Sequence, residues 1–207
     1  MSNQHVISPG GPRNIPMFIS LGLWLVLGIY WEVAARSASA PKSSESGASR
    51  AFHVLMANGA VIISFWPFTG WPNATWSYFE FPRVLPALGW QPPLGLAISA
   101  VCLLLALWAR HALGRNWSGA VTVKRDHQLV HSGPYRWIRH PIYAGAIGMH
   151  IGTALISGRL QGPLAIVLIV LAYVRKTRME ERVLGEVFGD SYAEYKRESW
   201  ALVPWVF

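Results

Sequence analysis

The feature that most constrains this chain is a series of apolar segments that approach the length of a membrane-spanning helix. Such a helix needs about 20 mostly apolar residues, with a lower limit of about 17. Five segments reach or approach this length: 15–35, 52–68, 94–109, 141–157 and 163–174. The sequence therefore predicts an all-α integral membrane protein with about five transmembrane helices. We expect the first segment to be a membrane helix and not a signal peptide that is removed, because it is long and lacks a convincing small-residue cleavage site.

The composition favours the same class of protein. Charged residues make up 14% of the 207 residues, against about 25% in soluble proteins. The chain also carries eleven tryptophans, a residue that favours the headgroup interface. The net charge of +8 would suggest nucleic acid in a soluble domain, but here the basic residues lie between apolar segments. We therefore expect attraction to anionic lipids and no nucleic-acid partner.

The distribution of Lys and Arg predicts the topology. The segments before, between and after the five apolar runs carry one, three, one, six, one and six of these residues. Because cytoplasmic loops are enriched in basic residues, we expect an external N-terminus and a cytoplasmic C-terminus. The polar linker 36–50 is expected to be flexible, and it shares the cytoplasmic side with the loop 110–140 and the C-terminal tail.

The C-terminal half has a recognisable organisation. Residues 158–162 are a short connection, so the fourth and fifth apolar segments are expected to form an antiparallel helical hairpin. The fifth helix is expected to continue beyond the bilayer to residue 188, and Gly189 is expected to end it. Tyr192 and Tyr195 then mark a short interfacial helix, where both are expected to pack. We interpret the chain as one domain, 1–207, with three spanning helices in 15–109 and the residues of chemical interest in 110–207.

A dense polar cluster lies at the start of the fourth apolar segment. Charges are costly beside a bilayer, so this cluster suggests a function. Pro141 suits the first turn of a helix, which places His140 at the helix N-terminus, where free N–H groups attract anions. The alternative is that basic residues here only anchor a helix end to lipid, and for Arg136 and Trp137 we favour that interpretation.

Further polar residues have two interpretations each. Lys176 and Glu180 are four residues apart and share a helix face; they either reach the edge of the bilayer or form ordinary ion pairs, and spacing alone favours ion pairs. His150 is either functional or hydrogen-bonded to a neighbouring helix, and we favour the hydrogen bond. His127 and His131 lack a nearby third ligand, so we expect no metal site.

Together these segments resemble the isoprenylcysteine carboxyl methyltransferase family and its relatives, the membrane phospholipid N-methyltransferases. The resemblance keeps both order and spacing in the C-terminal part of the chain. The matching residues are His127-x-Leu129-Val130-x-Ser132-Gly133-x-Tyr135, Arg139-His140-Pro141-x-Tyr143-x-Gly145, Glu180-Glu181 and Phe188-Gly189-x-x-Tyr192-x-x-Tyr195-Lys196.

The resemblance implies a cytoplasmic pocket for S-adenosyl-L-methionine. Its implied cofactor-binding residues are His127, Gln128, Leu129, Val130, Tyr135, His140, Pro141, Ile142, Tyr143 and Glu180. Glu180 and Lys176 are the implied catalytic residues, and Lys176 and Arg175 are the candidates for binding the acidic group of the substrate. The family has an arginine where this chain has Lys176, and lysine lacks the bidentate fork that suits a carboxylate.

The activity that this resemblance implies is methyl transfer to a membrane-embedded lipophile, foremost the carboxylate of a prenylated cysteine, which would enter from the bilayer. A carboxylate needs only alignment and exclusion of water. The alternative acceptor is a phospholipid amine or another small lipophile, whose proton Glu180 or Glu181 would accept. A non-enzymatic scaffold of the same fold is a further alternative, and a transporter is disfavoured because no internal repeat is visible. The oligomeric state is left open.

Overall fold

The computed structural model describes residues 15–36, 46–66, 81–114, 117 and 129–203. Helices dominate these ranges. In chain order they are α1 (Ile15–Arg36), α2 (Gly47–Ser64), α3 (Gln91–Leu113), the 3-10 helix η3 (Gly133–Arg136), α4 (Pro141–Ser157), α5 (Gln161–Phe188) and α6 (Asp190–Glu198). The expected all-helical class is thus observed in the described part of the chain.

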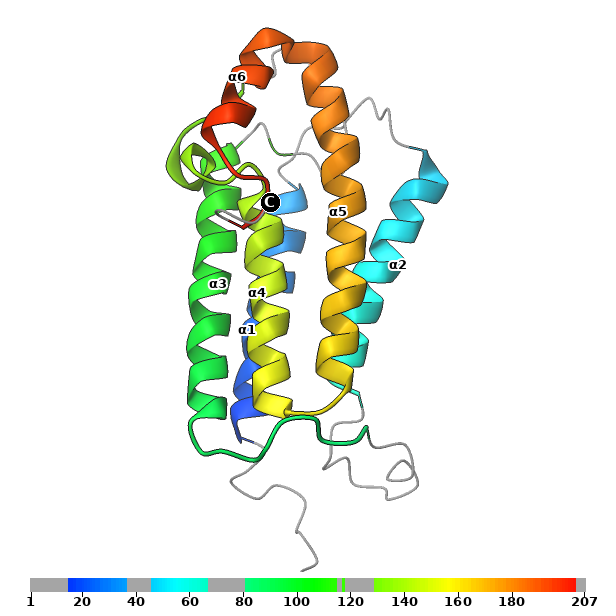
Figure 1. Ribbon diagram of the computed structural model, residues 1–207, viewed down its shortest axis with the longest axis vertical. Coiled ribbons are helices and arrows are strands. Elements are labelled where there is room, and N and C mark those ends of the chain that lie inside the picture. The colour runs from blue at the N-terminus through cyan, green and yellow to red at the C-terminus, as the bar shows by residue number, and fades with distance from the viewer. Residues whose placement is uncertain (1–14, 37–45, 67–80, 115–116, 118–128, 204–207) are drawn as a thin grey trace, which may run out of the picture.

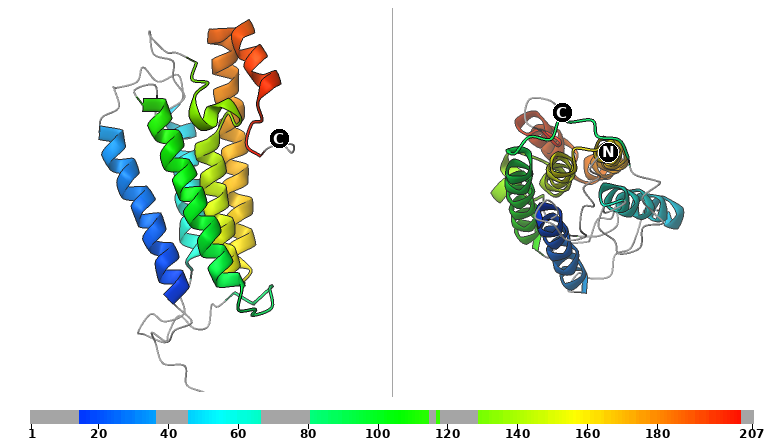
Figure 2. Two further views of the ribbon diagram at one scale, coloured as in Figure 1. Left: turned by 90° about the vertical axis from the view of Figure 1, so that its left-hand side faces the viewer. Right: turned by 90° about the horizontal axis from the view of Figure 1, so that it is seen from below.

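The long helices α1 to α5 run alternately up and down one bundle (Figures 1 and 2). α3 packs most extensively on α4, α2 packs on α5, and α1 packs on α3 and α4. Because the helices alternate, the helix ends that flank the three basic segments lie together at the upper end in Figure 1. α6 folds back over that same end.

Length and composition qualify two described helices as candidate membrane spans, namely Ile15–Ala34 and Gln91–Leu113. The other three long helices either carry polar residues or are shorter. α1 and α3 therefore have the length and composition of spanning helices.

Helix boundaries differ from the expected ones mainly at α2. The sequence suggested a flexible linker to residue 50 and a helix over 52–68, but the helix already begins at Gly47 and ends at Ser64. The reason is an N-cap: the Ser46 hydroxyl accepts a hydrogen bond of 3.2 Å from the Ser49 amide, which satisfies one free N–H group of the first turn. Residues 37–45 of the expected linker lie outside the described residues, as do residues 67–80, which include the last two residues of the expected helix.

The α3–α4 interface depends on residues without side chains. A Cβ atom added at Gly145 would lie 2.7 Å from the Cys102 carbonyl oxygen, and one added at Gly95 would lie 2.5 Å from the Gly152 carbonyl oxygen. Such close backbone approach is typical of small-residue packing between membrane helices. It fixes α4, and with it the polar residues at the start of α4, against α3.

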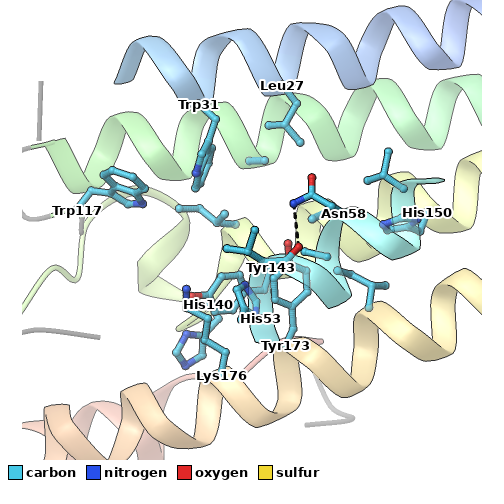
Figure 3. A pocket seen from close by; sticks show the side chains of 18 of the residues that line it. Leu27, Trp31, His53, Asn58, Trp117, His140, Tyr143, His150, Tyr173 and Lys176 are labelled. Carbon is cyan, nitrogen blue, oxygen red and sulfur yellow. Dashed lines mark hydrogen bonds between the residues drawn. The ribbon is translucent and has the colours of Figure 1, made fainter. Parts of the chain in front are cut away.

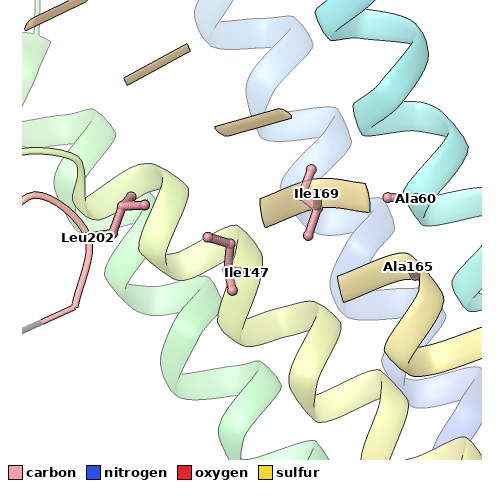
Figure 4. Close-up of a cluster of buried hydrophobic side chains, with 5 residues drawn as sticks. All are labelled: Ala60, Ile147, Ala165, Ile169 and Leu202. Atoms are coloured by element: carbon pink, nitrogen blue, oxygen red, sulfur yellow. The ribbon is translucent and has the colours of Figure 1, made fainter. Parts of the chain in front are cut away.

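The expected hairpin of α4 and α5 is present. Gly158 caps α4 with a φ of 62°, a left-handed conformation that glycine adopts without steric cost. Beyond the turn, α5 is continuous to Phe188, and Gly189, with a φ of 52°, separates it from α6. The buried apolar cluster between α2, α4 and α5 contains Ala60, Ile147, Ala165 and Ile169, joined by Leu202 of the C-terminal segment (Figure 4).

Candidate active site

The segment before α4 is held by the C-terminal segment. The backbone amide of Arg139 donates to the Trp200 carbonyl at 2.8 Å, and that of His140 donates to the Ala201 carbonyl at 3.0 Å. The buried Tyr195 hydroxyl of α6 donates to the Tyr135 carbonyl at 2.5 Å. Tyr195, Trp200 and Ala201, which follow α5 in the sequence, thus hold the backbone around Tyr135 and His140 in place.

His140 is the N-cap residue of α4 and is 6% exposed. Its Nδ1 atom lies 3.4 Å from Glu180 Oε2, and its Nε2 atom lies 3.4 Å from Glu181 Oε1. The Nε2 atom is buried, and its contact with Glu181 is too poorly aligned to be a hydrogen bond. His140 therefore sits between two carboxylates of α5 with one ring nitrogen unsatisfied.

Tyr143 connects the start of α4 to α5. Its hydroxyl donates a 2.6 Å hydrogen bond to Glu180 Oε1. Its ring stacks on His140, with 5.6 Å between ring centroids and an interplanar angle of 5°, and on Tyr173, with 4.5 Å and 13°. The result is a row of three stacked rings whose middle member, Tyr143, is hydrogen-bonded to Glu180.

Glu181 has a different environment from its neighbour. It accepts from Arg139 Nε at 2.8 Å and forms an ion pair of 2.8 Å with Lys196 Nζ. Arg139 also donates to the Ser199 carbonyl oxygen. Glu181 thus ties α5 to the segment before α4 and to α6, whereas Glu180 faces His140 and Tyr143.

The charges of this group reinforce one another. Burial alone would raise the pKa of Glu180, but His140, the charge of Lys176 and the Tyr143 hydroxyl outweigh burial and lower it. The pKa of Glu181 is likewise lowered, because His140, Lys196 and Arg139 outweigh its desolvation. Burial disfavours the imidazolium, yet the two carboxylates outweigh burial and raise the pKa of His140. Both carboxylates are therefore ionised at neutral pH.

A cavity of about 720 Å³ lies between α1, α2, α4 and α5. Its polar end contains Tyr135, His140, Tyr143, Lys176 and Glu180, and its apolar part extends along α1 and α2 past Leu21, Leu25, Ala57 and Val61 to His150. Figure 3 shows His140, Tyr143, Tyr173 and Lys176 side by side, with His150 well away from them. One cavity thus joins a charged end to an apolar interior.

The structure brings most of the predicted site residues together. Tyr135, His140, Ile142, Tyr143, Lys176 and Glu180 line the large cavity. Leu129 and Val130 line a neighbouring cavity of about 70 Å³, which shares Tyr135 and Arg139 with the large one. Pro141 is buried in the first turn of α4. His127 and Gln128 lie outside the described residues.

Arg175 is the predicted site residue that the structure places elsewhere. Its guanidinium donates to the Ser49 hydroxyl at 2.8 Å and lies 5.2 Å from the centre of the Phe52 ring. It is exposed and is not among the residues that line the cavity. Adjacent positions on a helix point about 100° apart, so Lys176 can face the cavity while Arg175 faces α2.

Comparison with known proteins shows which family this chain is similar to. The model of the phospholipid methyltransferase family matches residues 90–191. Protein-S-isoprenylcysteine O-methyltransferase of Saccharomyces cerevisiae is 35% identical over 117 residues, which cover 51% of this chain and 48% of that protein. The protein of the same name from Mus musculus is 30% identical over 183 residues, covering 86% of this chain and 61% of that protein. This chain belongs to the isoprenylcysteine carboxyl methyltransferase family.

The fold agrees with that family. A solved structure of a eukaryotic intramembrane Ras methyltransferase, isoprenylcysteine carboxyl methyltransferase, superimposes with a TM-score of 0.68 at 22% identity, covering 95% of this chain and 69% of the other. The chain spans about half the length of several curated isoprenylcysteine methyltransferases that it matches.

Sequence reasoning missed several residues of this candidate site. Tyr173, His53 and Arg50 line the cavity, as do Trp31 and Trp117, which meet edge to face. Tyr173 was detectable, because it precedes Lys176 by three residues and Glu180 by seven and so shares their helix face. The residues of α1 and α2 carried no comparable signal, since their segments match the family only as generic membrane spans.

Proposed function

We propose that this protein transfers a methyl group from S-adenosyl-L-methionine to a lipophilic substrate, foremost the carboxylate of a prenylated cysteine. One observation carries the proposal: a single cavity joins the cluster of His140, Tyr143, Lys176 and Glu180 to an apolar interior between helices. A molecule with a charged head and a hydrocarbon tail matches both parts.

The polar end suits the methyl donor. The ionised Glu180 and the rings of Tyr135 and Tyr143 provide a carboxylate and aromatic faces, both of which attract cations. The buried Nε2 atom of His140 lies 3.4 Å from Glu181 but makes no hydrogen bond, so it is a polar group to which a ligand could bond. When bound, S-adenosyl-L-methionine supplies an electrophilic methyl group on a positively charged sulfur.

Residues of this chain bind the acidic head group of the substrate, exclude water and align the reacting groups. Lys176, 8% exposed and lining the cavity, places a positive charge where an acidic head group would lie. A carboxylate acceptor is already ionised at neutral pH, so no side chain has to remove a proton from it. The packed rings of His140, Tyr143 and Tyr173 exclude water and restrict the geometry, which are the main requirements of such a transfer.

The apolar part of the cavity suits the tail of the substrate. It is lined by Leu21, Trp24, Leu25, Ala57 and Val61 of α1 and α2. We propose that α2, α4 and α5 span the bilayer together with α1 and α3, that the N-terminus is external, and that the polar end of the cavity is cytoplasmic. The tail then enters sideways from the membrane, without leaving the apolar phase.

A second candidate function is N-methylation of a phospholipid amine or another small lipophile. The match to the phospholipid methyltransferase family supports it, and so does Lys176, which lacks the fork that suits a carboxylate. In that reaction Glu180, held beside His140 and Tyr143, accepts the proton of the amine.

Acceptor competition tests the proposal. Detergent-purified protein is incubated with donor carrying a labelled methyl group, together with either N-acetyl-S-farnesylcysteine or phosphatidylethanolamine. The proposal predicts base-labile label in the farnesylcysteine product, as expected of a methyl ester. Label found in the aminophospholipid alone would replace the leading function by the second one, and label in neither would contradict both.

A further inference from the structure

We propose that Arg50 of α2 acts with Lys176 of α5 to bind the anionic head of the acceptor, and that Arg50 gives the site its preference for acids over neutral head groups. This inference rests on the proposed function and adds a specificity-determining residue to it. It also assigns to Arg50 the role that the sequence suggested for Arg175.

Helix periodicity places Arg50 on the cavity side of α2. The α2 residues that line the cavity are Arg50, His53, Val54, Ala57, Asn58 and Val61. Their spacing of three and four residues describes one continuous face of a helix. Arg50 is the first of them and stands in the opening turn of α2, so its guanidinium belongs to the polar end of the cavity.

The packing of α2 on α5 places Arg50 and Lys176 beside the same cavity. Ser49 accepts the 2.8 Å hydrogen bond from Arg175, and its hydroxyl lies 3.8 Å from the sulfur of Met179. Arg50 follows Ser49 directly, and Lys176 follows Arg175 directly. The contact between Ser49 and Arg175 therefore positions Arg50 and Lys176 beside the same cavity.

Arg139 also lines the cavity, and Arg110 lies near this end of the bundle, but both are engaged elsewhere. Arg139 is paired with Glu181, and Arg110 lies 4.3 Å from the centre of the Trp117 ring and donates to the Ala34 carbonyl. Among the described residues, none accepts a hydrogen bond from the Arg50 side chain or forms an ion pair with it. Arg50 is thus the guanidinium that remains available to a ligand in the cavity.

The chemistry of the two cations is complementary. A guanidinium offers two parallel N–H groups to the two oxygens of a carboxylate, whereas an ammonium offers a point charge. Arg50 thereby supplies from α2 the fork that Lys176 lacks on α5. Two positive charges at one head-group position favour an acid and disfavour a protonated amine.

Ligand binding tests the role of Arg50 without requiring turnover. The probes are farnesylthioacetic acid and its uncharged carboxamide, titrated into detergent-purified wild-type protein and into the variants Arg50→Gln, Arg50→Lys and Arg178→Gln. Arg178 is the matched control, because it is an exposed arginine near the same end of the bundle, as Arg50 is, but lies outside the cavity lining.

We expect Arg50→Gln to weaken binding of the acid about tenfold, the size typical of a hydrogen bond to a charged group, and to leave the carboxamide unaffected. Arg50→Lys should retain part of the preference, and Arg178→Gln should retain all of it. Unchanged acid binding in Arg50→Gln, or an equal loss in Arg178→Gln, would overturn the inference.

The same titrations separate this inference from the proposed function. A wild-type protein that binds the acid through Arg50 but transfers no methyl group would contradict the function and uphold the role of Arg50. Methyl transfer to the acid with an unchanged KM in Arg50→Gln would uphold the function and contradict the role of Arg50. Affinity for S-adenosyl-L-methionine in each variant verifies that the polar end of the cavity is still folded.

Discussion

Tyr143 donates a 2.6 Å hydrogen bond to Glu180 across 37 residues of chain. The two residues meet because the α4–α5 hairpin returns α5 along α4, and because α5 continues past the apolar segment as one helix. The start of α4 and the middle of α5 thereby form one wall of the cavity.

The first prediction concerns this hydrogen bond. Tyr143→Phe keeps the ring stack with His140 and Tyr173 but removes the hydroxyl that orients Glu180. We expect affinity for the methyl donor to fall by about 10- to 150-fold, because a hydrogen bond to a charged group contributes about 1.5–3 kcal/mol. Titration calorimetry measures the change. Tyr173→Phe is the control, since Tyr173 contributes its ring to the stack; an equal loss in that variant would show that the Tyr143 hydroxyl has no special role.

The second prediction concerns stability in acid. The pKa of Glu181 is lowered in the folded protein, so Glu181 adds stability above its unfolded pKa of about 4.3 and loses that contribution as the pH falls toward the folded value. We expect the Tm of the wild type in detergent to fall below about pH 5, and Glu181→Gln to show a lower Tm at neutral pH and a shallower acid slope. Glu194→Gln, changed at an exposed site of α6, should follow the wild type. If the Tm of Glu181→Gln fell with decreasing pH as steeply as that of the wild type, Glu181 would not be the source of the acid sensitivity.

The third prediction concerns the alkaline side. The pKa of His140 is raised by Glu180 and Glu181, so its contribution is complete below the unfolded pKa of about 6.5 and is lost as the pH rises through the folded value. The stability of the wild type should therefore decline from near-neutral pH upward. His140→Gln should flatten that decline in thermal unfolding measured across the pH range. If the stability of the variant declined at alkaline pH as much as that of the wild type, His140 would not be the cause of the decline.

The fourth prediction concerns an interhelical hydrogen bond inside the bundle. The Ser64 hydroxyl lies 2.8 Å from Nδ1 of His150 and joins α2 to α4, as expected from sequence for the buried histidine. Polar contacts of this kind between membrane helices contribute about 0.6 kcal/mol on average and up to about 2. Ser64→Ala should therefore lower the free energy of unfolding by about 1 kcal/mol, measured by denaturation in detergent. Ser157→Ala, whose hydroxyl donates to the Ala154 carbonyl and accepts from the Arg159 amide at the end of α4, joins no second helix and should have a smaller effect. The reverse order would show that the Ser64–His150 contact does not stabilise the bundle.

The fifth prediction concerns the close approach of α3 and α4. Gly145→Ala would place a methyl group 2.7 Å from the Cys102 carbonyl oxygen, and backbone cannot yield as a flexible side chain can. Overpacking of this kind costs about 1–3 kcal/mol, so the Tm should fall. Gly185→Ala is the opposite case, because the nearest atom to the new methyl group is 3.9 Å away and alanine is the better helix former. A stable Gly145→Ala variant would show that α3 and α4 are not in close contact there.

Much of the site was predictable from sequence because its residues lie on helices of known period. Pro141 indicated the start of α4 and placed His140 at its N-cap, and the short 158–162 connection predicted the hairpin that returns Glu180 to Tyr143. Lys176 and Glu180 were assigned to one helix face by their spacing alone. Each of these inferences needs only local geometry.

The features of the site that sequence did not predict depend on contacts between distant segments. Spacing could not show whether Arg175 or Lys176 faces the cavity, because that depends on the rotation of α5 against α2, which the Ser49–Arg175 hydrogen bond records. Likewise, nothing in the sequence of α2 distinguished Arg50 from an ordinary basic residue beside a membrane. The Ser46 N-cap was missed because the apolar pattern begins only after the first turn of α2.

The proposed function depends on binding of a methyl donor by the cluster of His140, Tyr143 and Glu180. The most direct test is calorimetric titration of the detergent-purified protein with S-adenosyl-L-methionine and, separately, with its demethylated product S-adenosylhomocysteine. We expect saturable binding of both compounds, with one site per chain, and we expect binding of both to weaken at least about tenfold in Glu180→Gln. Absence of binding to either compound, or unchanged affinity in Glu180→Gln, would contradict it.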